Sequence, residues 1–180
     1  MSDEFTPPVP ESPAPVADGA LHSLDPHSVQ HGRLVGGITA LAISSAILVG
    51  MIIVIYAIDD MPRVLRLLIP LAAMTAIFGL GILAWRWPVV EHAHTVYRVD
   101  ADGIEIRKGV IWRSVVNVPR SRIQHTDVSQ GPLERNFALS TLHVFTAGTE
   151  HSEVTLAGLQ HSRALRIRDH LLTGGEHDGV

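Results

Sequence analysis

Two long runs without a charged residue constrain this chain more than any other feature. One run extends from Leu34 to Ile58 and the other from Leu67 to Trp85, and neither contains an Asp, Glu, Lys or Arg. About 20 apolar residues of helix cross the hydrocarbon core of a bilayer, so both runs are long enough to span it. Two buried helices of a soluble protein are the alternative, but such helices normally carry a polar stripe. We therefore predict transmembrane helices at about residues 34–58 and 64–85.

The two runs are joined by the short segment "DDMPRVLR", which is long enough only for a turn. The predicted unit at residues 34–88 is therefore an antiparallel hairpin that leaves both chain ends on one side of the membrane. The number of arginines near the spans is the same on both sides, so charge alone does not say which side is cytoplasmic. Neither run has an ionisable residue at mid-depth, which disfavours a channel or transporter made by the hairpin alone.

A row of small residues follows one face of the first run, at Gly36, Ala40 and Ser44. Such rows let two helices approach closely. Packing within the hairpin and contact with a second protein or a second copy both explain the row. We therefore name these residues as a possible helix–helix interface.

Residues 1–33 precede the first run and hold five acidic residues and one arginine. The stretch "TPPVPESPAPVADGA" is rich in proline and small residues, which predicts a disordered tail. Three histidines lie there, but a solvated tail is favoured over a metal site because no complete ligand set accompanies them. The segment has no basic region ahead of the apolar run, so we expect a retained span and not a signal peptide.

From about residue 89 the pattern changes to strands. Tyr97 and Val99 alternate with polar residues, as do Ile104 and Ile106, and turns at Asp102-Gly103 and Lys108-Gly109 separate the segments. Trp112 is predicted to pack in the sheet. Near the end, Ala164, Ile167 and Leu171 recur at helical spacing. We predict an α+β domain over residues 89–172, followed by a flexible tail at 173–180.

The stretch "SRIQHTDVSQGPLERNFALSTLHVFTAG" carries a family signature. Its order and spacing resemble the bacterial pleckstrin-homology-like membrane proteins, the DUF304 or YdbS-like family, over residues 34–172. The resemblance implies a pleckstrin-homology-like antiparallel β-barrel capped by a C-terminal helix, with signature residues that are structural and not catalytic. These are Pro119, Ile123, Gln124, Gly131, Leu133, Arg135, Phe137, Leu139, Gly148, Gly158 and Leu159.

One position departs from that signature, because Ala138 stands where the resemblance implies glycine. If the position needs a positive φ, alanine there is strained. We expect Leu133, Phe137 and Leu139 to bury against the sheet, and Glu134 and Arg135 to stay outside.

The residues offer little for catalysis or metal binding. His125 and Asp127 share a strand face, as a catalytic dyad or as a surface polar pair, and the second reading is favoured because no nucleophile motif accompanies them. Glu91, His92 and His94 could begin a metal site, but a polar linker is favoured. The chain has no cysteine and no basic footprint for nucleic acid. We therefore expect no enzyme activity, no cofactor, no metal and no nucleic-acid partner.

The leading hypothesis is a non-enzymatic interaction or assembly module, tethered to membrane lipid at the cytoplasmic face of the plasma membrane. The cytoplasmic side and the partner are implied by the resemblance: another membrane protein, possibly a longer relative with several such domains, or a second copy. An anionic-lipid or small-ligand-binding module is the alternative. Three arginines of the last helix are its candidate lipid contacts, with a solvated helix face as the simpler reading: Arg163, Arg166 and Arg168.

Overall fold

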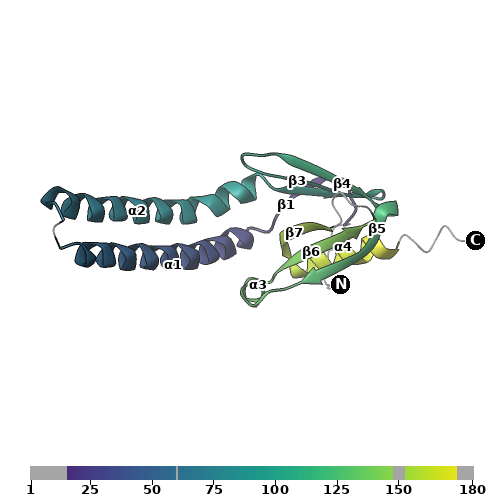
Figure 1. Ribbon diagram of the computed structural model, residues 1–180. Helices are drawn as coiled ribbons and strands as arrows, with labels where there is room; N and C mark the ends of the chain where they lie inside the picture. Colours follow the sequence, from purple (N-terminus) through teal and green to yellow (C-terminus); the bar gives the residue numbers. More distant parts are fainter. Residues whose placement is uncertain (1–15, 60, 148–152, 174–180) are drawn as a thin grey trace, which may run out of the picture.

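The computed structural model describes residues 16–59, 61–147 and 153–173. A long helical hairpin projects from a domain made of two sheets and a helix (Figure 1). The elements in chain order are β1 (Leu21–Ser23), α1 (His27–Ala57), α2 (Arg63–Ala93), β2 (Val96–Val99), β3 (Gly103–Lys108), β4 (Ser114–Pro119), the 3-10 turn η1 (Arg120–Arg122), β5 (Ile123–Ser129), α3 (Pro132–Asn136), β6 (Leu139–Thr146), β7 (Glu153–Gln160) and α4 (His161–Thr173).

The two hairpin helices are longer than the predicted spans. Each has 31 residues, or about 46 Å at 1.5 Å per residue, against about 30 Å for a hydrocarbon core. The extra turns are mostly at the domain end, where α1 begins at His27 and α2 continues to Ala93. No side chain of α1 is buried, and Ala73 alone is buried in α2. Both helices are therefore long and apolar enough to cross a membrane, and they do not form the core of a soluble domain.

The strands form two separate antiparallel sheets and not the closed barrel that we predicted. One sheet has the order β1-β2-β3-β4 and the other β5-β6-β7. Among the described strands, no ladder joins β4 to β5. The physical reason lies at the end of β4, where Pro119 has no N–H to donate and η1 turns the chain away before β5 begins. Helix α4 packs against the β5-β6-β7 sheet (Figure 1).

The core lies between the two sheets and α4, and it confirms the predicted strand faces. Tyr97, Val99, Ile104 and Ile106 are all buried, and they face residues of the second sheet and the predicted apolar stripe of the last helix. Those residues are Leu142, Val144, Val154, Leu156, Leu159, Ala164, Ile167 and Leu171. Burial raises the pKa of the Tyr97 phenol. The neutral phenol is favoured in the folded state, so this contribution to stability is lost as the pH rises above about 10.

The N-terminal segment differs from the predicted disordered tail. Leu21–Ser23 pairs with β2, Leu24 is buried in the core, and α1 starts at His27. Composition misled the prediction because the prolines are concentrated before residue 16, outside the described residues. The domain is thus built from both sides of the hairpin, which is inserted between β1 and β2. The predicted tail at 173–180 also lies outside the described residues, apart from Thr173 at the end of α4.

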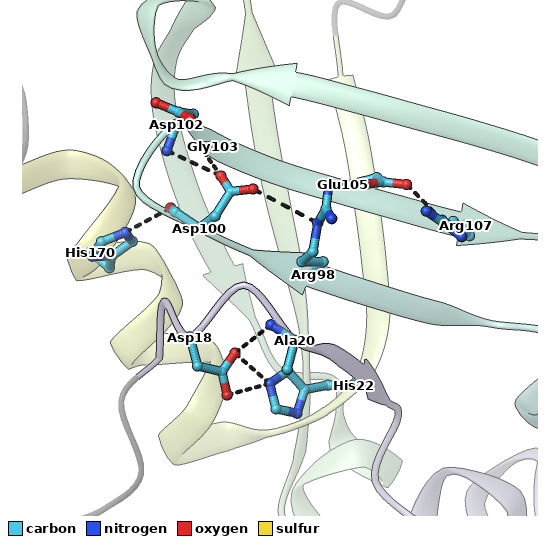
Figure 2. Close-up of polar contacts among 10 residues, drawn as sticks. All are labelled: Asp18, Ala20, His22, Arg98, Asp100, Asp102, Gly103, Glu105, Arg107 and His170. Carbon is cyan, nitrogen blue, oxygen red and sulfur yellow. Dashed lines mark hydrogen bonds and ion pairs between the residues drawn. The ribbon is translucent and has the colours of Figure 1, made fainter.

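Polar contacts stabilise the segment before α1 and the β2–β3 turn (Figure 2). The carboxylate of Asp18 accepts a hydrogen bond from the Ala20 N–H at 3.0 Å and lies 2.9 Å from His22 Nε2. The hydrogen bond from His22 is the main reason that the pKa of Asp18 lies below its usual value. In the β2–β3 turn, Asp100 accepts hydrogen bonds from the N–H groups of Asp102 and Gly103.

Acid should loosen the segment that contains β1. Because the folded-state pKa of Asp18 is lowered, its contribution is present above the unfolded pKa of about 3.9 and is lost as the pH falls through the folded value. Hydrogen-exchange mass spectrometry of residues 16–24 should show a protection factor that falls below about pH 4. Asp18→Asn should show reduced protection already at neutral pH. A protection factor in the unsubstituted chain that stays constant through this acid range would contradict the assignment.

Trp112 does not pack in the sheet, and its side chain is 87% exposed. The predicted two-residue turn at Lys108-Gly109 is in fact a longer connection, since β3 ends at Lys108 and β4 begins only at Ser114. Ile111 in the same connection is 75% exposed. The sequence pattern assigned Trp112 to the sheet, whereas both side chains lie in the β3–β4 connection.

Candidate functional site: the junction between the hairpin and the domain

The ends of the two long helices enter the domain side by side and contact each other there. The Ser28 hydroxyl of α1 lies 2.9 Å from Nδ1 of His92 in α2. His94 instead donates from Nδ1 to the Val90 carbonyl of its own helix at 2.7 Å. The two imidazoles therefore do not converge with Glu91, and no group of three His, Cys, Asp or Glu within the described residues is arranged to hold a metal.

Gly158 explains one part of the family signature. Its φ is +79°, and a Cβ built there would lie 2.9 Å from Cβ of Ser28. The Gly158 carbonyl also accepts a hydrogen bond from the Asp25 N–H at 3.1 Å. The start of α1 thus lies directly against β7, and only glycine combines this backbone conformation with this close approach. The next signature residue, Leu159, is buried in the core.

The turn from β5 into β6 is held by a side chain that we expected to stay outside. Glu134 accepts hydrogen bonds from the Gly131 N–H at 2.7 Å and from the Thr141 hydroxyl at 2.8 Å. The carboxylate therefore caps the start of α3 and ties it to β6. Arg135 is exposed, in agreement with the prediction.

The apolar residues of this turn divide between the core and the hairpin. Leu139 is buried as predicted, but Leu133 and Phe137 are only half-buried. The Phe137 ring meets His31 of α1 edge to face, with 5.9 Å between ring centroids. The sequence pattern assigned Phe137 to the sheet because it could not place α1 beside the turn. The signature aromatic therefore contacts the base of the hairpin.

Ala138 adopts the left-handed conformation that the signature glycine suggests, with a φ of 53°. It follows the end of α3, where this conformation closes a helix. Its carbonyl accepts the His161 N–H at 2.9 Å, so the conformation also joins the turn to the start of α4.

Ala138→Gly should stabilise the chain by about 0.5–1 kcal/mol. The left-handed conformation costs a non-glycine residue about 1–2 kcal/mol, and the greater freedom of glycine in the unfolded chain offsets part of the gain. Urea unfolding of the full chain in detergent micelles should show a higher midpoint. Ala157→Gly, at an exposed strand position with negative φ, is the matched control and should lower the midpoint. A lower midpoint for Ala138→Gly would contradict the account.

The other signature residues mark the edges of the two sheets. Pro119 ends β4, Ile123 packs against the core, and Gln124 lies at the bulge where the β5–β6 register shifts between Ile123 and His125. Gly148 lies outside the described residues. A structural role for the signature residues stays a prediction.

The predicted His125–Asp127 pair is not formed. His125 stacks on Phe145 with 4.2 Å between ring centroids, and Asp127 accepts a hydrogen bond from the Val128 N–H at 2.8 Å. Each side chain on this strand face therefore has its own neighbour. This geometry does not support a catalytic dyad.

A different polar chain crosses the same sheet and was missed from the sequence. Ser129 Oγ lies 2.8 Å from Nε2 of His143, whose Nδ1 lies 2.8 Å from Oε1 of Glu153. The order is that of a Ser-His-acid relay. Ser129 and Glu153 are exposed, however, and His143 is only half-buried. Three different strands contribute the residues, so the sheet register was needed to find them.

Two cavities flank the base of the hairpin. One, of about 550 Å³, opens between α2 and the β3–β4 connection, and its lining includes Leu24, Trp87, His92 and Trp112. The other, of about 580 Å³, is an apolar groove between α1 and α2 that includes Thr39 and Ala40. We call the second cavity the hairpin groove.

The row of small residues is used first for packing within the hairpin. A Cβ built on Gly36 would lie 3.2 Å from the carbonyl oxygen of Ala84 in α2, and one on Gly32 would lie 2.8 Å from Cβ of Pro88. Ala40 and Ser44 continue the half-buried stripe of α1. The hairpin helices therefore pack closely at Gly32 and Gly36, and a contact of this row with a second protein stays a prediction.

Comparison with known proteins agrees with this architecture. The family model described as a bacterial PH domain matches residues 33–174. The chain belongs to this bacterial PH domain family. It is 39% identical over 82 residues to the UPF0699 transmembrane protein YdbS of Bacillus subtilis (strain 168), an alignment that covers 46% of this chain and 50% of that protein. The chain thus spans about half the length of the curated relative it matches, and no solved structure matches it.

The family assignment confirms the resemblance seen in the signature, and two apolar helices accompany the PH-like domain. The match begins at Arg33 and so leaves out β1, Leu24 and Ser28, although these residues complete a sheet, the core and the junction. This bacterial PH domain protein therefore has a domain that extends beyond the family match at its N-terminal side.

Proposed function

We propose that this bacterial PH domain protein is a non-enzymatic interaction or assembly module, anchored by a two-span hairpin at the cytoplasmic face of the plasma membrane. The observation that carries the proposal is the insertion of an exposed apolar hairpin into the domain between β1 and β2. The domain is joined to the hairpin both before α1 and after α2. These two connections hold the domain in one orientation relative to the bilayer. A fixed orientation and a high local concentration let weak contacts with a membrane partner suffice.

The exposure of the helices supports the membrane anchor. Leu41, Leu67, Met74 and Phe78 are each at least 69% exposed, and no charged residue interrupts residues 34–58 or 67–85. Water would make this surface unfavourable, whereas lipid tails cover it without cost. At the domain end, the Arg33 guanidinium lies 4.3 Å from the Trp85 ring centroid, as expected for side chains at a headgroup boundary. The cytoplasmic placement of both chain ends comes from the family resemblance.

The hairpin groove supports the choice of partner. Its lining is mainly apolar, and it lies in the half of the hairpin nearest the domain. A helix of another membrane protein fits such a groove better than a polar ligand does. The occupant in this proposal is a membrane helix, from a longer relative with several PH-like domains or from a second copy.

Co-purification tests this proposal. The tagged full chain, solubilised from native membranes in mild detergent, should elute with a membrane protein in stoichiometric amount or as an oligomer. Thr39→Phe would fill the groove and should reduce the recovered partner at least tenfold. Ser45→Phe is the matched control, because both hydroxyls donate to the carbonyl four residues earlier and Ser45 lies outside the groove lining. A chain that always elutes alone as a monomer would contradict the proposal.

The anionic-lipid alternative has a second set of candidate cations besides the predicted Arg163, Arg166 and Arg168, which are half-buried. Arg163 lies over the Tyr97 ring at 5.7 Å, and Arg168 pairs with Asp169 at 2.7 Å. Lys108 and Arg113, by contrast, are exposed beside the β3–β4 connection and near the hairpin. Binding of the full chain to anionic vesicles that weakens with salt would support this second function.

A further inference from the structure

We propose that the β3–β4 connection, residues 109–113, is a membrane-interface loop that places Ile111 and Trp112 among the lipid headgroups beside the hairpin. The proposal rests on the membrane anchor described above and adds a second, non-helical contact with the same leaflet. Its starting point is the exposure of two adjacent large apolar residues in one loop, 75% for Ile111 and 87% for Trp112. Adjacent exposed residues of this size mark an interaction surface.

The position of the loop points to the bilayer. Val110 and Trp112 line the same cavity as Trp87 and Pro88 of α2. Trp87 comes two residues after Trp85, where the second charge-free run ends. Figure 1 shows the β3–β4 connection at the end of its sheet that faces the hairpin. The loop tip therefore lies at the level where α2 leaves the hydrocarbon, which is the headgroup region.

The chemistry of the loop suits that region. Tryptophan has an apolar body and one N–H donor, and it is enriched where one end of a side chain is apolar and the other wet. Lys108 and Arg113 flank the apolar pair and are both exposed. These cations would attract anionic headgroups, while a helix partner would leave them unpaired in hydrocarbon. The occupant is therefore the lipid interface.

The backbone of the loop is built to hold this shape. Gly109 has a φ of 121°, and a Cβ there would overlap the carbonyl oxygen of Trp112. Any other residue at position 109 would push the two arms of the loop apart. The close approach fixes the path of the chain around Ile111 and Trp112, so both side chains remain outside the sheet.

Spin labels measure the depth of the loop directly, because the chain has no cysteine of its own. We would place single nitroxides at Ile111→Cys, Phe78→Cys and Ala101→Cys in the full chain. Bilayers of equal parts phosphatidylcholine and phosphatidylglycerol would hold the protein. Phe78 is 72% exposed within α2, and Ala101 is exposed in the turn at the opposite end of the sheet. Power saturation compares access by oxygen, which prefers lipid, with access by a water-soluble nickel complex.

The expected ratio of oxygen to nickel access is highest at position 78, lowest at 101 and intermediate at 111. Adding Trp112→Ser to the position-111 label should shift that label at least halfway toward the value at 101. A ratio at 111 equal to that at 101, with 78 still in lipid, would overturn the loop proposal and leave the anchor standing. Water access at 78 would overturn both. If the label at position 111 were protected from the nickel complex in native membranes but not in lipid bilayers, the lipid interface would be wrong and the loop would bind a protein partner.

Discussion

Gly158→Ala is expected to lower the free energy of unfolding of the full chain by about 2–5 kcal/mol. Two penalties add at this position. The positive φ costs a non-glycine residue about 1–2 kcal/mol, and overpacking costs about 1–3 kcal/mol, because the new Cβ would lie 2.9 Å from Cβ of Ser28. The base of α1 must then move away from β7. Urea unfolding in detergent micelles measures the loss.

Two further variants separate the backbone penalty from the steric penalty. Gly19 has a φ of +67° and nothing within 4 Å of an added Cβ, so Gly19→Ala reports the backbone penalty alone, about 1 kcal/mol. Ser28→Gly combined with Gly158→Ala should recover the steric part, seen as a favourable coupling in a double-mutant cycle. A loss for Gly158→Ala no larger than that for Gly19→Ala would contradict the steric penalty from the close approach of α1 to β7.

Phe78→Arg should impair membrane insertion more than any conservative change in the hairpin. An arginine at the centre of a spanning helix costs about 2.5–3.5 kcal/mol on insertion scales, and Phe78 is 72% exposed on α2. The fraction of chain resistant to carbonate extraction should fall several-fold.

Trp112→Arg is the control for this variant, because Trp112 is also a large, exposed aromatic residue but lies outside the two long helices. Trp112→Arg should leave the fraction resistant to carbonate extraction unchanged, since the hairpin alone keeps the chain in the membrane. Phe78→Leu should also behave like the unsubstituted protein. If arginine at position 78 were as harmless as arginine at position 112, α2 would face water and the membrane anchor would be wrong.

Periodicity predicted the parts of the fold that depend on neighbours in sequence. The alternation at Tyr97 and Val99 follows from the period of two of a half-buried strand, and the spacing of Ala164, Ile167 and Leu171 from the period of a helix. Both faces are buried as predicted. The two long apolar helices were also predicted from local sequence, because an uninterrupted apolar run is recognised without tertiary information.

The junction could not be predicted because its contacts join distant positions. Ser28 and His92 are 64 residues apart, and Phe137 meets His31 across more than 100 residues. Strand β1 is only three residues long, so pairing with β2 and not its own sequence defines it. Trp112 was assigned to the sheet because a longer connection between β3 and β4 has no signal beyond Gly109. The local sequence pattern identifies which face of a strand or helix is buried. Which element packs against that face depends on the topology of the fold.

Thiol labelling of intact cells tests the central claim, a hairpin that crosses the membrane twice and leaves the domain inside. Asp59→Cys lies at the exposed hairpin turn, and Ala101→Cys lies in the β2–β3 turn of the domain. A membrane-impermeant maleimide should label position 59 in intact cells and position 101 only after the membrane is permeabilised. Labelling of position 101 in intact cells, or protection of both positions until permeabilisation, would contradict the proposed topology.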